Sequence, residues 1–291
     1  MLKYIVKAMR PKQWTKNAFV FAALIFDRKL FDLSSLERTL LTFGLFCLLA
    51  SSVYLLNDIM DIEADRIHPV KKNRPIASGM LPISLAVIVA ILLLLVALVG
   101  SYVLYIGTFF IFLIYFVLNL AYSKWLKHIA IIDVLVIAAC FVLRVAAGVS
   151  VIQVERFSPW LYVVTTLFAL YLGFGKRRAE ISLLIPENNT SHRRVLAGYS
   201  VDLIDQLITI VSSTTIIAYS LYTFSAPNLP ENHAMMLTIP FVLYGVFRYL
   251  SLIQINKKGG EPEDLLLNDR PLQITIVLWG IAVFLIFYLF M

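Results

Sequence analysis

Long apolar runs dominate the chain, and short segments between them carry most of its charge. A helix needs about 17–25 apolar residues to cross a bilayer, and none of the runs alternates like the strand of a membrane β-barrel. The pattern predicts an all-α polytopic membrane protein, with one integral domain over residues 1–291 and a bundle of nine transmembrane helices. The predicted spans are approximately Lys12–Phe26, Leu40–Leu56, Leu81–Gly100, Tyr102–Tyr122, Ile129–Ser150, Pro159–Phe174, Leu203–Phe224, Met235–Ile253 and Pro271–Phe290.

Three of these spans are less sharply defined than the others. The first is the weakest, because its purely apolar stretch is short. The third and fourth run together and are parted only by Gly100-Ser101 and Gly107. Glycine and serine suit a tight turn, so the pattern predicts a reversal of the chain there.

Composition and charge support this interpretation. Hydrophobic residues make up 60% of the chain and charged residues 15%, against about 25% charged in soluble domains. Most lysines and arginines fall in the N-terminal segment and in every second connection between spans. The positive-inside rule then places the N-terminus and these connections in the cytoplasm, for a protein of the inner or plasma membrane. We expect any polar chemistry at that face, and no nucleic-acid partner.

The most informative segment follows the second span and begins "NDIMDIEAD" at Asn57. Asp58, Asp61 and Asp65 have the spacing i, i+3, i+7, which puts them on one face of a continuing helix. Asn57 adds an amide oxygen to that face, whereas Glu63 points elsewhere and is read as a solvated bystander. Hard oxygen donors at this density suit Mg²⁺ that also binds substrate phosphate. The pattern predicts a site for a Mg²⁺-bound diphosphate.

Cations follow the acids almost at once. Arg66, Lys71, Lys72 and Arg74 precede Pro75, and the prolines of this segment restrict the backbone that presents them. One of the two lysines is expected to be a plain surface charge. The alternative is that the whole segment is only the polar end of a membrane helix. Acids on one stripe followed by clustered cations favour a metal and phosphate site.

Three further stretches carry candidate site residues near the same face. Tyr122 and Lys127 stand before the fifth span, and Lys176 and Arg177 follow the sixth, as candidates for phosphate binding. Charges inside spans are costly and often functional. The secondary candidates are Asp133, Arg144 and Asp269, and each keeps a structural alternative. Arg144 could make a structural Asp–Arg contact, and Asp269 could cap a helix before Pro271.

The motif at Asn57–Asp65 resembles the NDxxDxxxD motif of the UbiA superfamily of intramembrane prenyltransferases. The resemblance implies a UbiA-like fold and a cavity open to the cytoplasm in which Mg²⁺ binds a diphosphate. The rest of the chain resembles the decaprenyl-phosphate phosphoribosyltransferase branch. The segments that carry this second resemblance are "RPKQWTKN" from Arg10, "DRIHPVKKNRPIASG" from Asp65, "YSKWLKH" from Tyr122, "FGKRRAE" from Phe174 and "EDLLLNDRPL" from Glu263.

That branch implies the transfer of 5-phosphoribose from phosphoribosyl pyrophosphate to a polyprenyl phosphate such as decaprenyl phosphate, with release of pyrophosphate, for lipid-linked pentose or arabinose precursors. A single acid cluster among many cations suits a donor with an additional 5-phosphate. The implied metal ligands are Asn57, Asp58, Asp61 and Asp65, of which the three aspartates are catalytic. The implied donor-phosphate ligands are Arg66, Lys71, Arg74, Tyr122, Lys127, Lys176 and Arg177. Gln13 and Lys16 are expected to orient the acceptor phosphate.

Two other functions are weighed against this one. The nearest is a UbiA-type prenyltransferase with a polyprenyl diphosphate donor and an aromatic (quinone or haem precursor) or lipid acceptor, which shares the acid motif. A transporter would have charges along a path through the membrane and matched interrupted helices. Here the charges gather at one face, apart from Arg144. The sequence leaves a homo-oligomer open.

Overall fold

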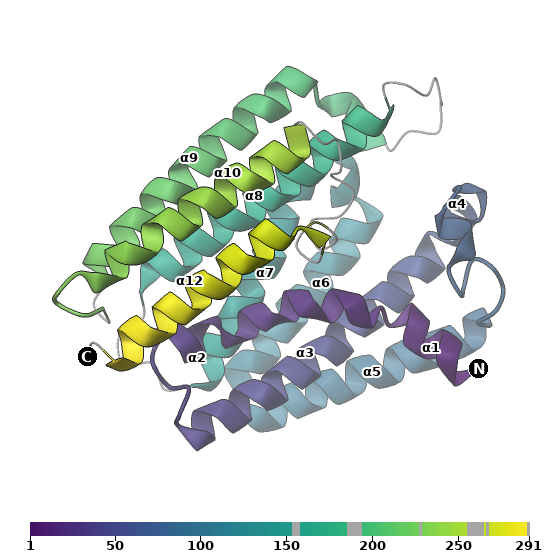
Figure 1. The fold of residues 1–291 in the computed structure, drawn as a ribbon. Helices are drawn as coiled ribbons and strands as arrows, with labels where there is room; N and C mark the ends of the chain where they lie inside the picture. Colours follow the sequence, from purple (N-terminus) through teal and green to yellow (C-terminus); the bar gives the residue numbers. More distant parts are fainter. Residues whose placement is uncertain (153–157, 185–193, 227–228, 255–264, 266–267, 290–291) are drawn as a thin grey trace. The chain divides into compact units, whose positions relative to one another are not determined.

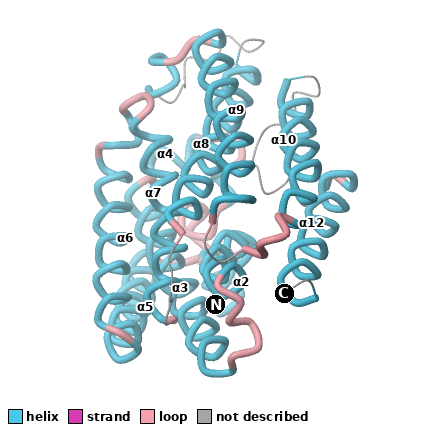
Figure 2. The backbone as a smooth tube through the Cα atoms, turned by 90° about the vertical axis from the view of Figure 1, so that its left-hand side faces the viewer, coloured by secondary structure: helices cyan, strands magenta, loops and turns pink. Residues whose placement is uncertain are grey.

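The computed structural model describes residues 1–152, 158–184, 194–226, 229–254, 265 and 268–289. The described residues form helices joined by turns and contain no strand (Figures 1 and 2). Some predicted features, namely Glu263, Asp264, Leu266, Leu267 and the end of the ninth span at Phe290, lie outside these ranges. The elements are α1 (Leu2–Ala8), η1 (Pro11–Phe21), α2 (Ala22–Phe26), α3 (Leu33–Met60), α4 (Ile62–Ile67), η2 (Lys71–Asn73), α5 (Ile83–Leu104), α6 (Ile106–Lys124), η3 (Leu126–His128), α7 (Ile132–Val151), α8 (Pro159–Leu184), η4 (Arg194–Gly198), α9 (Val201–Ser225), η5 (Ala234–Thr238), α10 (Ile239–Gln254) and α12 (Arg270–Leu289), where η denotes a 3₁₀ helix.

The chain groups into two compact units. Unit 1 comprises Met1–Leu126 with Leu143–Glu155, and unit 2 comprises Lys127–Val142 with Arg156–Met291. The α7 helix contributes its first half to unit 2 and its second half to unit 1. The prediction of one integral domain therefore stays a prediction, and each unit is described by itself.

In the described chain, seven helices are long and apolar enough to cross a membrane. They are Leu33–Met60, Ile83–Leu104, Ile106–Lys124, Ile132–Val151, Val201–Ser225, Ala234–Gln254 and Arg270–Tyr288. The all-α, multi-pass prediction is confirmed, but the count of nine is not. The first predicted span is the 3₁₀ helix η1 followed by the short α2. The sixth predicted span corresponds to α8. The last turns of α8 carry Lys176, Arg177, Arg178 and Glu180, so its apolar part is too short to be counted among the seven membrane-spanning helices.

Unit 1 is built on α3, which packs along α5 (Figure 1). Asp32 begins α3 as its N-cap, and its carboxylate accepts hydrogen bonds from the Ser35 N–H at 3.2 Å and the Ser35 hydroxyl at 2.5 Å. The hydrogen bond from the Ser35 side chain lowers the pKa of Asp32, so this carboxylate stays ionised where the positive end of the helix dipole favours it.

The turn between α5 and α6 lies at Tyr105, not at Gly100-Ser101 as predicted. Tyr105 is the one extended residue between the two helices. Gly100 lies inside α5, and a Cβ atom there would be 2.6 Å from the Leu45 side chain of α3. This glycine therefore permits close helix packing, and the surrounding leucines and valines let the helix continue to Leu104.

A second close approach joins η1 to the end of α7. A Cβ atom at Gly148 would be 2.0 Å from the carbonyl oxygen of Val20, a backbone atom that cannot rotate away. We expect Gly148→Ala to lower the free energy of unfolding by about 1–3 kcal/mol, as overpacking does. The thermal unfolding midpoint of the purified protein in detergent measures this. The control is Gly44→Ala in α3, where nothing lies within 4 Å of the added Cβ. Equal midpoints for the two variants would contradict the contact.

Unit 2 consists of α8, α9, α10 and α12 with the first half of α7. α8 packs along α9, and α10 packs along α12 (Figure 1). The buried hydroxyl of Tyr171 donates a hydrogen bond of 2.7 Å to the Val246 carbonyl, and its ring meets that of Tyr249 edge-on at 5.2 Å. These contacts hold α8 against α10 within one hydrophobic core.

Candidate active site

The acid motif occupies the junction of α3 and α4 in unit 1. Asp61 is the single residue between the end of α3 and the start of α4, and its N–H donates to the Asn57 carbonyl at 2.9 Å. The Asp65 N–H then donates to the Asp61 carbonyl at 2.8 Å. Helical hydrogen bonding therefore runs through the junction, as the motif's spacing predicts.

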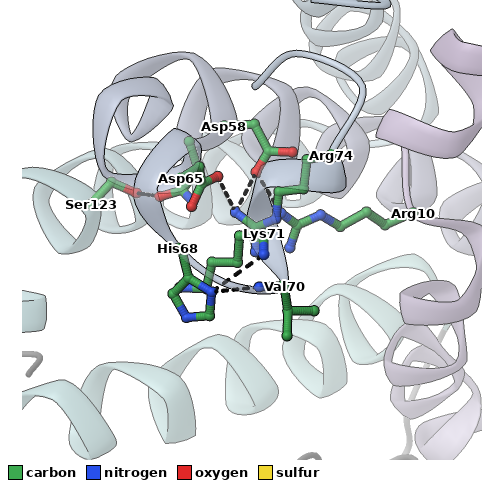
Figure 3. Close-up of polar contacts among 9 residues, drawn as sticks. Arg10, Asp58, Asp65, His68, Val70, Lys71, Arg74 and Ser123 are labelled. Carbon is green, nitrogen blue, oxygen red and sulfur yellow. Dashed lines mark hydrogen bonds and ion pairs between the residues drawn. The ribbon is translucent and has the colours of Figure 1, made fainter. Parts of the chain in front are cut away.

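Asp58 and Asp65 are buried, with 2% and 3% of their surface exposed. Both accept hydrogen bonds from one guanidinium nitrogen of Arg74, at 3.1 Å to Asp58 Oδ1 and 2.5 Å to Asp65 Oδ2. Figure 3 shows this arginine reaching both carboxylates. The structure thus brings together two predicted metal ligands and one predicted phosphate ligand. Two buried anions require a compensating cation, and here guanidinium supplies it.

Arg10 also belongs to this cluster, and sequence reasoning missed it. Its guanidinium forms an ion pair with Asp58 Oδ1, which is the same oxygen that Arg74 contacts (Figure 3). It also lies 5.1 Å from the centre of the Tyr54 ring. Arg10 has left-handed backbone angles, φ 55° and ψ 62°, directly before Pro11. The only sequence signal is its place at the start of "RPKQWTKN", because a contact across 48 residues leaves no local pattern.

Asn57 has a different partner from the acids. Its side-chain oxygen accepts a hydrogen bond of 2.9 Å from the hydroxyl of Ser123 on α6. Ser123 was not among the predicted residues, whereas its neighbour Tyr122 was. Tyr122 is half-buried in the same last turn of α6. The described structure therefore brings α6 to the acid motif through Asn57.

The basic loop after α4 is ordered by His68. Its Nδ1 atom accepts hydrogen bonds from the Val70 N–H at 3.2 Å and the Lys71 N–H at 3.3 Å (Figure 3). Partial desolvation of the exposed His68 side chain, and then the charge of Lys71, lower its pKa. The ring is therefore neutral at physiological pH, and its Nδ1 atom remains a hydrogen-bond acceptor. Arg66 is exposed and donates to the Ala77 carbonyl at 3.4 Å. The loop holds Lys71 and Arg74 in place after the acids.

Gln13 and Lys16 both lie half-buried on η1. The indole N–H of Trp14 donates to the Ser51 hydroxyl at 3.1 Å, and the one proton of that hydroxyl is shared between the Cys47 carbonyl at 2.7 Å and the Met9 carbonyl at 3.2 Å. These bonds hold the start of η1 on α3, six residues before Asn57. The two predicted acceptor ligands therefore follow Arg10 on a segment anchored beside the acid-bearing helix.

Arg144 is buried in the second half of α7 and anchors the other end of η1. Its guanidinium donates to Asn17 Oδ1 at 2.9 Å and to the Tyr115 hydroxyl at 3.0 Å. It also lies over the rings of Phe46, at 5.3 Å, and Tyr115, at 5.1 Å. These contacts give Arg144 a structural role in holding η1. They are made to an asparagine and to aromatic residues, whereas the alternative that the sequence left open was an Asp–Arg contact, which stays a prediction.

Unit 2 has its own buried charged network. Asp133, which is fully buried, accepts hydrogen bonds from Arg177 Nε at 2.6 Å and from the Tyr199 hydroxyl at 2.7 Å. Arg177 also donates to Glu180 at 2.6 Å, and the Tyr199 hydroxyl accepts from the Ile131 N–H at 2.6 Å. Burial, and then the hydrogen bond to Asp133, raise the pKa of Tyr199. The phenol therefore stays protonated and can donate to Asp133. Asp133 and Arg177, two separately predicted residues, are thus each other's partners, and the phosphate role of Arg177 stays a prediction.

The remaining candidates of unit 2 lie on α8, in η3 and directly before α12. Lys176 is half-buried on α8, and Lys127 is half-buried in η3. Asp269 accepts from the Leu272 N–H at 3.0 Å, so it caps the start of α12, and it forms a two-point ion pair with Arg248 at 2.8 and 3.2 Å. Capping was one of the two roles predicted for Asp269. Arg248 was missed, because it stands alone in an apolar run.

The acid motif fits Mg²⁺ in its donor chemistry. It offers carboxylate and amide oxygens, which that ion prefers. In the described part of the chain, no three His, Cys, Asp or Glu side chains converge closely enough to hold a metal ion. Asp58 and Asp65 instead face guanidinium groups. The buried carboxylates of the site therefore require positive charge. In this structure Arg10 and Arg74 neutralise the oxygens that a metal ion would also bind.

Comparison with known proteins places the chain in a family. The model described as the UbiA prenyltransferase family matches residues 18–178, more than half of the chain, including the acid motif. The chain belongs to the UbiA prenyltransferase family. The predicted membership and the prediction of a membrane-bound transferase are thereby confirmed.

Relatives of this UbiA family member extend over nearly its whole length. Decaprenyl-phosphate phosphoribosyltransferase from Mycobacterium tuberculosis is 32% identical over 94% of this chain and 91% of the relative. The enzyme of the same name from Corynebacterium glutamicum is 30% identical over 98% and 87%. A solved UbiA homolog from Archaeoglobus fulgidus, bound to DMAPP and Mg²⁺, superposes with a TM-score of 0.74 at 17% identity over 98% and 99% of the two chains. That similarity confirms the UbiA-like fold.

Proposed function

We propose that this protein transfers 5-phosphoribose from phosphoribosyl pyrophosphate to a polyprenyl phosphate and releases pyrophosphate. The observation that carries the proposal is the convergence of Arg10 and Arg74 on Asp58 and Asp65. Acids and arginines in one cluster suit a ligand that brings both a divalent metal and several phosphates. The names and coverage of the mycobacterial and corynebacterial relatives support this choice of donor and acceptor.

The reaction requires the bond between C1 of the ribose and the diphosphate oxygen to break. The leaving pyrophosphate keeps the electron pair, and an acceptor phosphate oxygen forms the new bond to C1. Mg²⁺ held by Asn57, Asp58, Asp61 and Asp65 would supply charge neutralisation for the leaving pyrophosphate. Arg66, Lys71 and Arg74 would bind donor phosphates and stabilise the same charge. The acceptor phosphate is already anionic, so no strong general base is needed.

The segment η1 would orient the acceptor. Gln13 and Lys16 lie on it after Arg10, and both side chains can bind a phosphate. We propose that the lipid tail lies between apolar helices and that the head group enters from the cytoplasmic side of the plasma membrane. Tyr122, Lys127, Lys176 and Arg177 remain candidates for further phosphate contacts.

The donor can be tested by protection against heat. A ligand at 100 times its Kd stabilises the folded protein by about 2.7 kcal/mol. We expect phosphoribosyl pyrophosphate with Mg²⁺ to raise the thermal unfolding midpoint of the protein in detergent. Ribose 5-phosphate with Mg²⁺, which lacks the diphosphate, serves as the control and is expected to raise it little. A larger shift with geranyl diphosphate and Mg²⁺ would favour a prenyl donor instead.

A further inference from the structure

One carboxylate oxygen in the acid motif has two arginine partners. Asp58 Oδ1 accepts from Arg74 at 3.1 Å and also pairs with Arg10. The Asp58 side chain is 2% exposed, whereas the side chains of both arginines are 25% exposed. The anion is therefore inside the protein, and its counter-ions reach it from a side open to solvent.

We propose that Arg10 is an exchangeable counter-ion of Asp58. In the donor-free protein it neutralises this carboxylate, and it moves to the diphosphate when Mg²⁺ takes the carboxylate oxygen. The proposal rests on the part of the proposed function that puts Mg²⁺ and a diphosphate at Asp58. It adds a residue to that site and a reason for the two ligands to bind together.

Electrostatics gives the direction of the effect. A buried carboxylate without a partner is strongly disfavoured, so Asp58 keeps a cation at all times. Binding of Mg²⁺ without donor would have to displace Arg10 from an oxygen that Arg74 also contacts, and the positive charges repel one another. A diphosphate offers the displaced guanidinium a new anionic partner with the two-point geometry that arginine prefers. Each ligand therefore makes binding of the other more favourable, which is a coupling between sites that works in both directions.

The backbone of Arg10 supports a defined placement. Left-handed angles are rare for a residue with a side chain, and more so directly before proline. Such outliers persist where the surrounding structure holds them and often mark functional sites. Trp14 and Ser51 hold the chain just after Arg10, and Ser51 holds the Met9 carbonyl just before it. The Tyr54 ring, whose centre is 5.1 Å from the guanidinium, gives the cation a second favourable contact in this position.

The test uses two binding measurements on the full chain in detergent. Binding of Mn²⁺, as a paramagnetic substitute for Mg²⁺, is followed without donor from the electron paramagnetic resonance signal of the free ion. Binding of labelled inorganic pyrophosphate is followed by equilibrium dialysis at saturating Mg²⁺. The variant is Arg10→Asn, because asparagine tolerates left-handed angles and is too short to replace the guanidinium. We expect Mn²⁺ to bind this variant about tenfold more tightly than the wild type, and pyrophosphate to bind about tenfold more weakly.

Tighter Mn²⁺ binding together with weaker pyrophosphate binding distinguishes an exchangeable counter-ion from a residue that only binds pyrophosphate or only holds the fold. The matched control is Lys12→Asn, which removes an equal charge from an exposed position two residues away and should change neither affinity by more than about twofold. Arg10→Lys keeps a cation at Asp58, so its affinity for Mn²⁺ should stay within about twofold of the wild type. Unchanged or weaker Mn²⁺ binding by Arg10→Asn would overturn the proposal, as would an equal gain in Lys12→Asn or a tenfold gain in Arg10→Lys. Since the probe is pyrophosphate, failure of phosphoribosyl pyrophosphate as a donor would leave this result intact.

Discussion

Asp61→Asn is expected to lower kcat by about a thousandfold, which corresponds to about 4 kcal/mol of lost transition-state stabilisation. Asp61 lies at the junction of α3 and α4, between the two arginine-bound carboxylates Asp58 and Asp65. Asparagine keeps the size of the side chain and removes the negative charge on which the proposed metal binding depends. Because Asp61 is only half-buried, the fold should survive. Turnover of labelled donor by the purified variant measures the loss.

Glu63→Gln is the matched control for this variant. Glu63 carries the same kind of charge two residues away and is exposed on α4. We expect its kcat to stay within about twofold of the wild type, and both variants to keep the wild-type unfolding midpoint. Near-normal turnover in Asp61→Asn would remove Asp61 from the metal site.

The second large effect concerns the stability of unit 2. Arg177→Met is expected to lower the free energy of unfolding by about 3–5 kcal/mol, since it leaves the buried Asp133 carboxylate without its cation. The double variant Asp133→Leu/Arg177→Met should recover most of this loss, because the two apolar side chains remove the charged pair together. Thermal unfolding midpoints of the single and double variants in detergent give the coupling between the two residues.

The same variants test the alternative role of Arg177. If Arg177 is mainly a ligand of donor phosphate, Arg177→Met will keep the wild-type midpoint and bind pyrophosphate with Mg²⁺ more weakly. The double variant would then recover nothing. The structure favours the first outcome, because Arg177 is 1% exposed and donates to both Asp133 and Glu180.

The sequence predicted the parts of the fold that depend on local pattern. Continuous apolar runs produced α3, α5, α6, α7, α9, α10 and α12, because bilayer thickness sets their length. The first span was not confirmed as one long α-helix. Over Lys12–Phe26 the chain forms a 3₁₀ helix followed by the short α2, and Asn17 binds Arg144 instead of continuing an apolar face. The turn at Tyr105 was missed because a glycine can mark either a turn or a close helix contact, and only the neighbouring helix decides.

The candidate site was predictable where its residues are adjacent in sequence. The spacing of Asp58, Asp61 and Asp65 and the cations after them gave the acid motif and Arg74. Contacts that join distant segments were not predictable. Arg10 reaches Asp58 across 48 residues, and Arg177 reaches Asp133 across 44. A lone arginine in a basic terminus or at the end of a span has the same pattern whether it anchors the chain in the membrane or neutralises a buried acid.

The identity of the donor is the central claim, and product formation tests it most directly. Purified protein would be given Mg²⁺, polyprenyl phosphate and phosphoribosyl pyrophosphate labelled in the ribose, and the lipid extract would be assayed for label. The account predicts a labelled, lipid-linked phosphoribose in the wild type and none in Asp61→Asn. Absence of this product, together with turnover of a polyprenyl diphosphate and an aromatic acceptor, would contradict it.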